Sequence, residues 1–344
     1  MTEETIKVSM MRMRTGRGNA VLLPDANLRI AVLWGGESAE REVSAQSASQ
    51  VSSALSAAGH TVSRHEITPD LDFAFLRTGI DVAFIAAHGA YGEDGTIQGI
   101  LELLHVPYVG SDVATSALCF DKYLTKRMLR TADLHLPLGH CISVQSAEPV
   151  HAIQEAGAAY GYPLVVKPRR GGSTIGLSII HGPEEAEAAW NQASPFGDVL
   201  VEECIEGTEI TVAIVGNEPP LVCPPIEIVS HNPVYDYDAK YTPGASEHVI
   251  PARLPEQAIA ACRDAALLAH TTLGCRDLSR TDMIVDASGT PHVLEINTIP
   301  GLTQVSLLPD AANAAGVPFP ALCELLIDLA LHRSTKELNE ATAQ

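Results

Sequence analysis

The sequence predicts an α/β protein of more than one domain, on three observations. Between residues 28 and 109, apolar strand-like runs alternate with segments of helical composition, which is typical of a parallel sheet. Beyond residue 121, shorter strand-like runs are separated by glycine-rich or acidic turns. The chain has 344 residues, enough for two or three domains and a substantial core.

The N-terminal part has a β-α-β-α rhythm. Its predicted strands cover residues 28–34, 82–87 and 107–109, and the helices between them end at Gly59 and near Leu104. The carboxyl ends of parallel strands meet at one edge of a sheet, where open α/β sheets bind ligands. We therefore expect the loops that follow the first two strands to lie at a binding site.

The central and C-terminal parts have a different composition, and we place domain boundaries near residues 121 and 207. Strands are predicted at residues 164–167, 178–180 and 199–203, and helices at 122–130, 151–160, 183–192, 255–273 and 319–332. Residues 230–251 are polar and without periodicity, so we expect a long functional or disordered loop. Residues 334–344 are expected to fray, and residues 1–27 to form a loose extension rather than a signal peptide.

A hairpin is predicted from two strand-like runs, residues 281–285 and 292–296, that flank the turn-like segment DASGT. In an antiparallel pair, directly opposed residues point to the same face. One face would then hold the polar residues Arg280, Asp282, Glu295 and Asn297, with Asp282 opposite Glu295 and Arg280 opposite Asn297. The other face would hold the core residues Met283, Val285, Leu294 and Ile296.

The polar face of this hairpin has two interpretations. Facing carboxylates repel unless a cation lies between them, and carboxylate and amide oxygens are ligands that suit Mg²⁺. The alternative is a solvated face with a chance ion pair. The hairpin alone does not decide between the two.

Composition excludes some function classes. The formal net charge of −20 argues against a general binder of nucleic acid or anionic membranes, although a single pocket can still be basic. The seven cysteines form no C-x-x-C pair, so we expect reduced thiols rather than a zinc site or a disulfide framework. No apolar run is long enough to span a membrane.

Several loops contain residues that could take part in chemistry. Lys167 begins the basic, glycine-rich segment KPRRGGSTIG, whose backbone amides could wrap phosphate oxygens, although it lacks a Walker A pattern. Residues 199–209 form a strand that ends in acids and could face a nucleotide. Glu40 and His88 follow predicted strands. Taken singly, each has an ordinary structural interpretation: a hairpin turn, a solvated acidic turn, a helix-start acid or a satisfied loop histidine.

Taken together, ten ordered segments resemble the ATP-grasp ligases and, within them, the D-alanine–D-alanine ligase family. They are GGESAEREVS (35–44), HGAYGEDGTIQG (88–99), PYVGS (107–111), DK (121–122), VVKP (165–168), GSTIG (172–176), EGTE (206–209), YDYDAKY (235–241), RTD (280–282) and LEINTIPGLT (294–303). No single segment is specific, but their order from about residue 28 to about residue 329 is.

The resemblance implies an ATP-grasp fold behind an N-terminal Rossmann-like domain, with ATP held between two antiparallel sheets. The corresponding divisions are residues 1–27 (flexible extension), 28–120 (Rossmann-like domain), 121–206 (central lid domain), 207–333 (C-terminal domain) and 334–344 (tail). It also implies a cytoplasmic homodimer that makes D-alanyl-D-alanine for peptidoglycan, through an acyl phosphate formed from ATP, without binding nucleic acid or membrane.

The resemblance assigns the nucleotide and metal positions. Phosphate contacts are implied for Lys122, Lys167 and the loop around Ser173, adenine contacts for Glu202, Glu203 and Ile205, a ribose contact for Glu209, and a further nucleotide contact for Lys240. Two Mg²⁺ ions, replaceable by Mn²⁺, are implied at Asp282, Glu295 and Asn297.

The amino-acid positions follow from the same resemblance. Glu40, linked to Ser173 and Tyr241, would bind the ammonium group of the first D-alanine, near His88. Arg280 and the amide of Gly301 would stabilise developing charge. The carboxylate of the second D-alanine would be bound by Lys240, Ser306 and Leu307.

Three positions depart from the family pattern: Gly171 stands where an acid is frequent, and Asp112 and Asp277 stand where glycine is common. Aspartate tolerates left-handed backbone better than most residues, so we expect the turn at Asp277 to survive. Alternative functions are a D-alanine–D-lactate or D-alanine–D-serine ligase, which Tyr241 disfavours for lactate, and a nucleotide-binding regulator without catalysis, which the intact Arg280, Asp282 and Glu295 disfavour.

Overall fold

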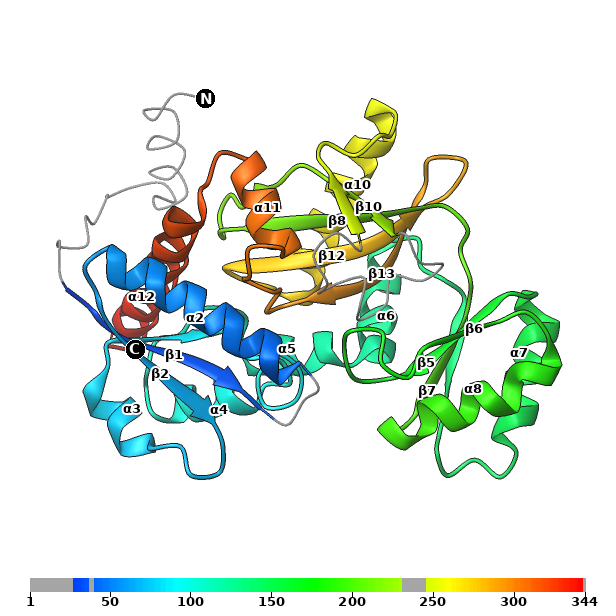
Figure 1. The fold of residues 1–344 in the computed structure, drawn as a ribbon, viewed down its shortest axis with the longest axis horizontal. Coiled ribbons are helices and arrows are strands. Elements are labelled where there is room, and N and C mark those ends of the chain that lie inside the picture. Colours follow the sequence, from blue (N-terminus) through cyan, green and yellow to red (C-terminus); the bar gives the residue numbers. More distant parts are fainter. Residues whose placement is uncertain (1–26, 37–39, 231–245, 343–344) are drawn as a thin grey trace.

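The computed structural model describes residues 27–36, 40–230 and 246–342. The elements form three sheets with helices packed on them (Figure 1). In Figure 1 the N-terminal layer lies at the lower left, the largest sheet above it, and the central sheet with its helices at the right. The site described below lies where these three parts meet.

The N-terminal layer is a parallel sheet, as the sequence predicts. Its strand order is β2-β1-β3, formed by β1 (Arg29–Gly35), β2 (Thr61–Ile67) and β3 (Val82–Ile85). Its helices are α2 (Arg41–Ala57), α3 (Phe73–Gly79) and α4 (Thr96–Leu103). The strand predicted at residues 107–109 is reduced to a single bridge between Ala83 and Tyr108. Two connecting helices follow, α5 (Val113–Phe120) and α6 (Lys122–Leu129).

The central part is a four-stranded antiparallel sheet of order β4-β7-β5-β6. Its strands are β4 (Gly139–Ile142), β5 (Leu164–Pro168), β6 (Ser178–Ile180) and β7 (Val199–Glu203). Helices α7 (Pro149–Tyr160) and α8 (Ala186–Ala193) supply the side chains that form a separate apolar core with these strands. The glycine-rich loop connects β5 to its antiparallel neighbour β6, so it is the turn of a hairpin at the edge of this sheet.

The C-terminal sheet has the order β11-β10-β8-β12-β13, with β9 paired to β8. Its strands are β8 (Thr208–Val215), β9 (Leu221–Val222), β10 (Ile226–Ser230), β11 (Ser246–Val249), β12 (Leu278–Val285) and β13 (Pro291–Asn297), and its helices are α10 (Glu256–Leu273), α11 (Leu307–Ala314) and α12 (Phe319–Thr342). Helix α12 packs against α2, so one apolar core joins the end of the chain to the N-terminal layer (Figure 1).

Two C-terminal predictions were wrong. Residues 246–249 form the edge strand β11 rather than loop, which the polar sequence SEHV concealed, since edge strands tolerate charge and lack a core pattern. Helix α12 continues to Thr342, past the predicted fraying point. The predicted loop residues 231–245, including Lys240 and Tyr241, lie outside the described residues.

Within the described chain, no single helix is both long and apolar enough to cross a membrane. Only α11 and α12, taken together as a pair bent by 97° and counted to residue 333, meet the length and composition criteria.

The hairpin of β12 and β13 has the predicted register. Arg280 lies opposite Asn297, and Asp282 opposite Glu295. Met283, Val285 and Ile296 are buried, as expected for the core face. The prediction for Leu294 was wrong: a β-bulge shifts the register after Asp282, so that Met283 pairs with Val293 and Leu294 lines a pocket beside Glu295.

Candidate active site

Sixteen of the eighteen predicted site residues line two adjoining pockets between the three sheets, and the other two are Lys240 and Tyr241, outside the described residues. The first, here the Glu40 pocket, is lined among others by Glu40, His88, Glu93, Lys122, Ser173, Arg280, Glu295, Asn297, Gly301, Ser306 and Leu307. The second, here the Lys167 pocket, is lined among others by Lys122, Lys167, Ser173, Glu202, Glu203, Ile205, Glu209, Asp282, Leu294, Glu295 and Leu307.

The two pockets share a wall. Lys122, Glu295, Leu307 and residues 171–173 line both of them. The Lys122 Nζ donates a hydrogen bond to the carbonyl oxygen of Gly171 at 2.6 Å and lies 3.1 Å from Glu295 Oε2. A group bound in one pocket can therefore reach a group bound in the other beside a lysine, a carboxylate and the amides of the glycine loop.

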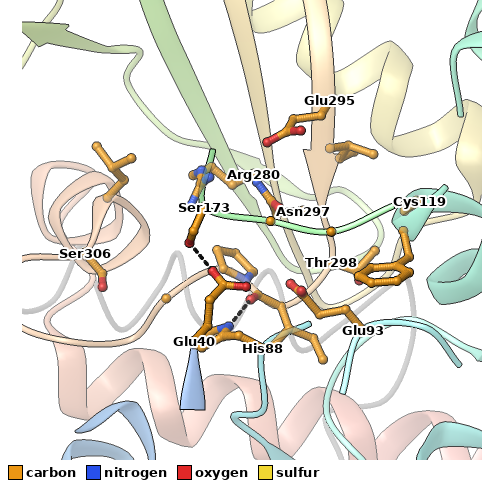
Figure 2. Close-up of a pocket in the computed structure, with 18 of the residues that line it drawn as sticks. Glu40, His88, Glu93, Cys119, Ser173, Arg280, Glu295, Asn297, Thr298 and Ser306 are labelled. Carbon is orange, nitrogen blue, oxygen red and sulfur yellow. Dashed lines mark hydrogen bonds between the residues drawn. The ribbon is translucent and has the colours of Figure 1, made fainter. Parts of the chain in front are cut away.

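Glu40 and the glycine loop are in direct contact in the Glu40 pocket (Figure 2). Glu40 is the residue before α2, and its carboxylate accepts a hydrogen bond from the hydroxyl of Ser173. Ser173 adopts left-handed backbone, with φ of 51°. A Cβ atom at Gly172 would lie 2.8 Å from Glu40 Oε2, so any other residue at this position requires the carboxylate or the loop to shift.

His88 lies beneath Glu40 in Figure 2 and is buried. Its Nδ1 lies 3.1 Å from the carbonyl oxygen of Ile299, which fixes Nδ1 as the donor, and its Nε2 lies 3.4 Å from Ser47 Oγ. Burial lowers the pKa of the imidazole below its ordinary value. His88 therefore connects the N-terminal layer to the segment after β13.

Glu93, which was not among the predicted site residues, also points into the Glu40 pocket (Figure 2). Its Oε2 accepts a hydrogen bond from the backbone N–H of Gly89 at 2.7 Å. Burial, together with the nearby charge of Glu40, raises the pKa of the Glu93 carboxyl to about 8. Glu93 lies in the segment that follows His88, at the carboxyl end of β3, and this position alone could have identified it as a candidate site residue.

The polar face of the hairpin gathers opposite charges. Asp282 accepts hydrogen bonds from Arg280 at 2.9 and 2.7 Å, from Thr211 Oγ1 at 2.6 Å and from Asn297 Nδ2 at 3.2 Å. The second carboxylate, Glu295, faces Lys122. The face is therefore polar and partly buried, with both Asp282 oxygens and Glu295 Oε2 against cations or donors.

This donor set fits a magnesium ion. In the described residues, no three His, Cys, Asp or Glu side chains form a cluster able to hold a metal by themselves. Asp282, Glu295 and Asn297 offer two carboxylates and one amide oxygen on one face, beside both pockets. Magnesium is usually held by one or two carboxylates and completed by substrate phosphates, so an incomplete protein shell of this kind is what it requires.

A buried ion cluster supports the Lys167 pocket. Glu202, only 2% exposed, pairs with Lys167 at 2.9 Å and with Lys126 on its other oxygen. Burial lowers the pKa of Lys126 to about 8. Lys126 was not predicted, although it lies four residues after Lys122, on the same side of α6. Both side-chain oxygens of Glu202 are engaged with lysines. The adenine contact that the resemblance implies for Glu202 stays a prediction.

Two antiparallel sheets, facing each other across a lysine-lined pocket beneath a glycine loop, define the chain as an ATP-grasp protein. Two family models match it: the C-terminal part of D-ala D-ala ligase over residues 131–328, and the N-terminal part over residues 70–111. The chain therefore belongs to the D-alanine–D-alanine ligase family.

Individual relatives agree with this assignment. The D-alanine–D-alanine ligase of Pelotomaculum thermopropionicum is 46% identical over 308 residues, which are 88% of this chain and 97% of that protein. The Bacillus anthracis D-alanine–D-alanine ligase complexed with ATP has a TM-score of 0.75 and 31% identity, covering 91% of this chain and 99% of that one. A D-Ala:D-Ser ligase from Enterococcus faecalis has a TM-score of 0.76 and 30% identity, covering 89% and 100%.

Proposed function

We propose that this chain joins two D-alanine molecules into D-alanyl-D-alanine, with ATP as the energy source, for the synthesis of peptidoglycan precursors. The observation that carries the proposal is the wall shared by the two pockets, which would bring a nucleotide and an amino acid to the same lysine, carboxylate and glycine loop. Family membership agrees with an ATP-dependent ligase.

The Lys167 pocket is the proposed nucleotide site. Lys122 and Lys167 would face the α- and β-phosphates, and the loop around Ser173 would cover the γ-phosphate. Phosphate binding is supported by the two lysines and by a turn whose amides are not hindered by side chains. Glu203, Ile205 and Glu209 would line the adenosine half, with Lys240 as a further contact.

Asp282, Glu295 and Asn297 would hold magnesium, and we propose two ions, as the resemblance implies. When bound, the ions would supply positive charge to the transferring phosphoryl group. Arg280 lies on the same face as these donors, so it can stabilise negative charge at the same point, and the Gly301 amide would assist it.

The Glu40 pocket is the proposed amino-acid site. Glu40 would bind the ammonium group of the first D-alanine, held in place by Ser173 and, outside the described residues, by Tyr241. Leu307 begins helix α11, with Ser306 as its N-cap residue. The N-terminus of a helix attracts carboxylates, which supports Ser306, Leu307 and Lys240 as the site for the second D-alanine.

The chemistry follows from these placements. A carboxylate is a poor acyl donor at neutral pH, so the first D-alanine would be phosphorylated by ATP. The amine of the second would then attack the acyl carbon and release phosphate. Enclosure between the three sheets would protect the acyl phosphate from water. We further propose a cytoplasmic homodimer, and the seven free thiols are consistent with a reducing compartment.

The test is phosphate release from ATP by the purified chain. We expect release that depends on both Mg²⁺ and D-alanine, with D-alanyl-D-alanine as the product by mass spectrometry. Absence of D-alanine-dependent release would refute the proposal. Competition of D-alanine with D-lactate and D-serine, at several pH values, would identify the acceptor. If D-lactate or D-serine were incorporated preferentially, that compound and not D-alanine would be the second substrate.

A further inference from the structure

Asp277 is a buried aspartate outside both pockets, at the start of the strand that holds the active-site arginine. Its side chain has 0% exposure, and its backbone has φ of 65°. The next residue begins β12, which carries Arg280 and Asp282. A fully buried carboxylate is costly unless it is paired and hydrogen-bonded, so its partners indicate what it holds together.

Those partners come from segments far apart in the sequence. Arg333 Nη1, near the end of the packed part of α12, donates to both Asp277 oxygens at 2.7 Å. The backbone N–H of Gly110, in the N-terminal layer, donates at 2.9 Å, and Asn217 Nδ2, after β8, donates at 3.0 Å. We call this group of Asp277, Arg333, Gly110 and Asn217 the Asp277 clasp.

Arg333 extends the clasp into the N-terminal layer. Its Nη2 donates to the carbonyl oxygen of Tyr108 at 2.6 Å, and its guanidinium lies over the Tyr108 ring, 5.8 Å from the centroid. Tyr108 is bridged to Ala83 on β3, the strand that leads to His88. The clasp therefore ties the strand of Arg280 to the strand that leads to His88.

The two pockets depend differently on this connection. The Glu40 pocket takes Glu40 and His88 from the N-terminal layer, and Arg280 and Asn297 from the C-terminal sheet. The Lys167 pocket is lined only by residues from Lys122 onward. A change in the placement of the N-terminal layer against the C-terminal sheet would thus alter the first pocket and leave the second intact.

We propose that Asp277 and Arg333 are positioning residues that set the distance between the two halves of the Glu40 pocket, and so the affinity for the amino-acid substrates. They touch neither pocket and act only through the strands they join. The kinetic part of this inference rests on the proposed ligase function.

The test compares Asp277→Asn, Arg333→Met and the double variant. Asparagine has the shape of aspartate and tolerates left-handed backbone, so Asp277→Asn keeps the turn. It removes the charge and replaces one acceptor oxygen with an amide donor that faces the donors of the clasp. We expect the KM for D-alanine to rise about tenfold while the dissociation constant of ADP changes by less than about twofold. The double variant should resemble the single variants, because each single variant already breaks the Asp277–Arg333 ion pair.

Two further variants separate positioning from general stability. Arg333→Lys keeps the charge and loses the planar contacts, so we expect an intermediate KM for D-alanine. Glu227→Gln is the matched control: Glu227 is 8% exposed and pairs with Arg253 at 2.6 Å without joining two layers. Glu227→Gln should lower the melting temperature and leave both the KM for D-alanine and the dissociation constant of ADP unchanged. Equal losses for D-alanine and ADP, or effects that multiply in the double variant, would overturn the inference.

The result also stays separable from failure of the proposed function. If the wild-type chain shows no D-alanine-dependent turnover, the proposed function fails, and hydrogen exchange then tests the clasp alone. In Asp277→Asn we expect faster exchange at residues 108–111 and 40–44, with unchanged exchange in the glycine loop at residues 171–176. Uniformly faster exchange, or none, would refute the clasp.

Discussion

The two pockets are built in opposite ways. The Lys167 pocket lies between two antiparallel sheets, and its central ion cluster, Glu202 with Lys126 and Lys167, is almost completely buried. The Glu40 pocket is assembled from loops of three parts of the chain, and its central contact joins Glu40 to Ser173, 133 residues away. The first is lined only by residues from Lys122 onward, while the second depends on how the N-terminal layer is placed against the rest. Substitutions should therefore act differently on the two sides.

The largest effect is expected at the shared wall. Replacing Glu295 with alanine removes a carboxylate that faces both pockets and leaves Lys122 without this partner. We expect turnover to fall at least about 1,000-fold, with the fold retained, because charge stabilisation at the transferring group is lost. Steady-state phosphate release measures the turnover, and circular dichroism shows whether the fold is retained. An active Glu295→Ala enzyme would contradict the metal assignment.

A buried lysine should come next. Lys126→Met leaves Glu202 with one cationic partner in a buried site. We expect the free energy of unfolding to fall by about 2 kcal/mol and the KM for ATP to rise, with the KM for D-alanine little changed. Urea unfolding and initial-rate kinetics measure these. Lys126→Arg, which keeps the charge, is the control, and a loss confined to D-alanine would contradict the division between the pockets.

A smaller effect is expected from a substitution at Gly172, and it should fall on the Glu40 pocket rather than on the Lys167 pocket. The added methyl group of Gly172→Ala would meet Glu40 Oε2 at 2.8 Å, so loop and carboxylate must separate. We expect the KM for D-alanine to rise about tenfold, with ADP affinity retained. Gly99→Ala is the control, since neither Gly99 nor Gly172 has a positive φ, and a Cβ atom added at Gly99 would lie 3.8 Å from its nearest neighbour, Val113 Cγ2. Equal effects of the two substitutions would show that contact with Glu40 is not responsible.

The smallest effect concerns pH. The pKa of Glu93 is raised from 4.5 to about 8, so the folded protein keeps a proton that the unfolded chain has lost between these values. Stability from this group is therefore lost as pH rises from 4.5 to about 8. Glu93→Gln should lessen that loss, so that the melting temperature falls less across this pH range than it does in the wild type. Identical pH profiles for the variant and the wild type would show that Glu93 titrates normally.

Local patterns were sufficient for the β12–β13 hairpin, but not for its neighbour β8 or for helix α11, which were not predicted. The pairing of Asp282 with Glu295 was predictable because alternation and a short turn fix an antiparallel register. Leu294 was misplaced because a one-residue bulge leaves no mark in the periodicity. Strand β11 was missed because its pairing with β10 depends on an available edge, not on its own composition.

Long-range contacts could not be derived from the residues alone. The link between Glu40 and Ser173 was expected only from the family resemblance, since nothing in either segment specifies the other. The left-handed turn at Asp277 was predicted and is confirmed, but its pairing with Arg333 was not, because a buried ion pair 56 residues apart has no local signature. Lys126 and Glu93 could have been selected from their positions on α6 and after β3.

The parts of the pocket linings that are not shared bear on how new acceptors can arise. His88 and Ser306 border the Glu40 pocket without touching the Lys167 pocket. Substitutions among such residues can alter which amino or hydroxy acid is accepted while the phosphorylating half is inherited unchanged. A lineage could thus exchange the terminal residue of its cell-wall precursor without evolving a second way to use nucleotide.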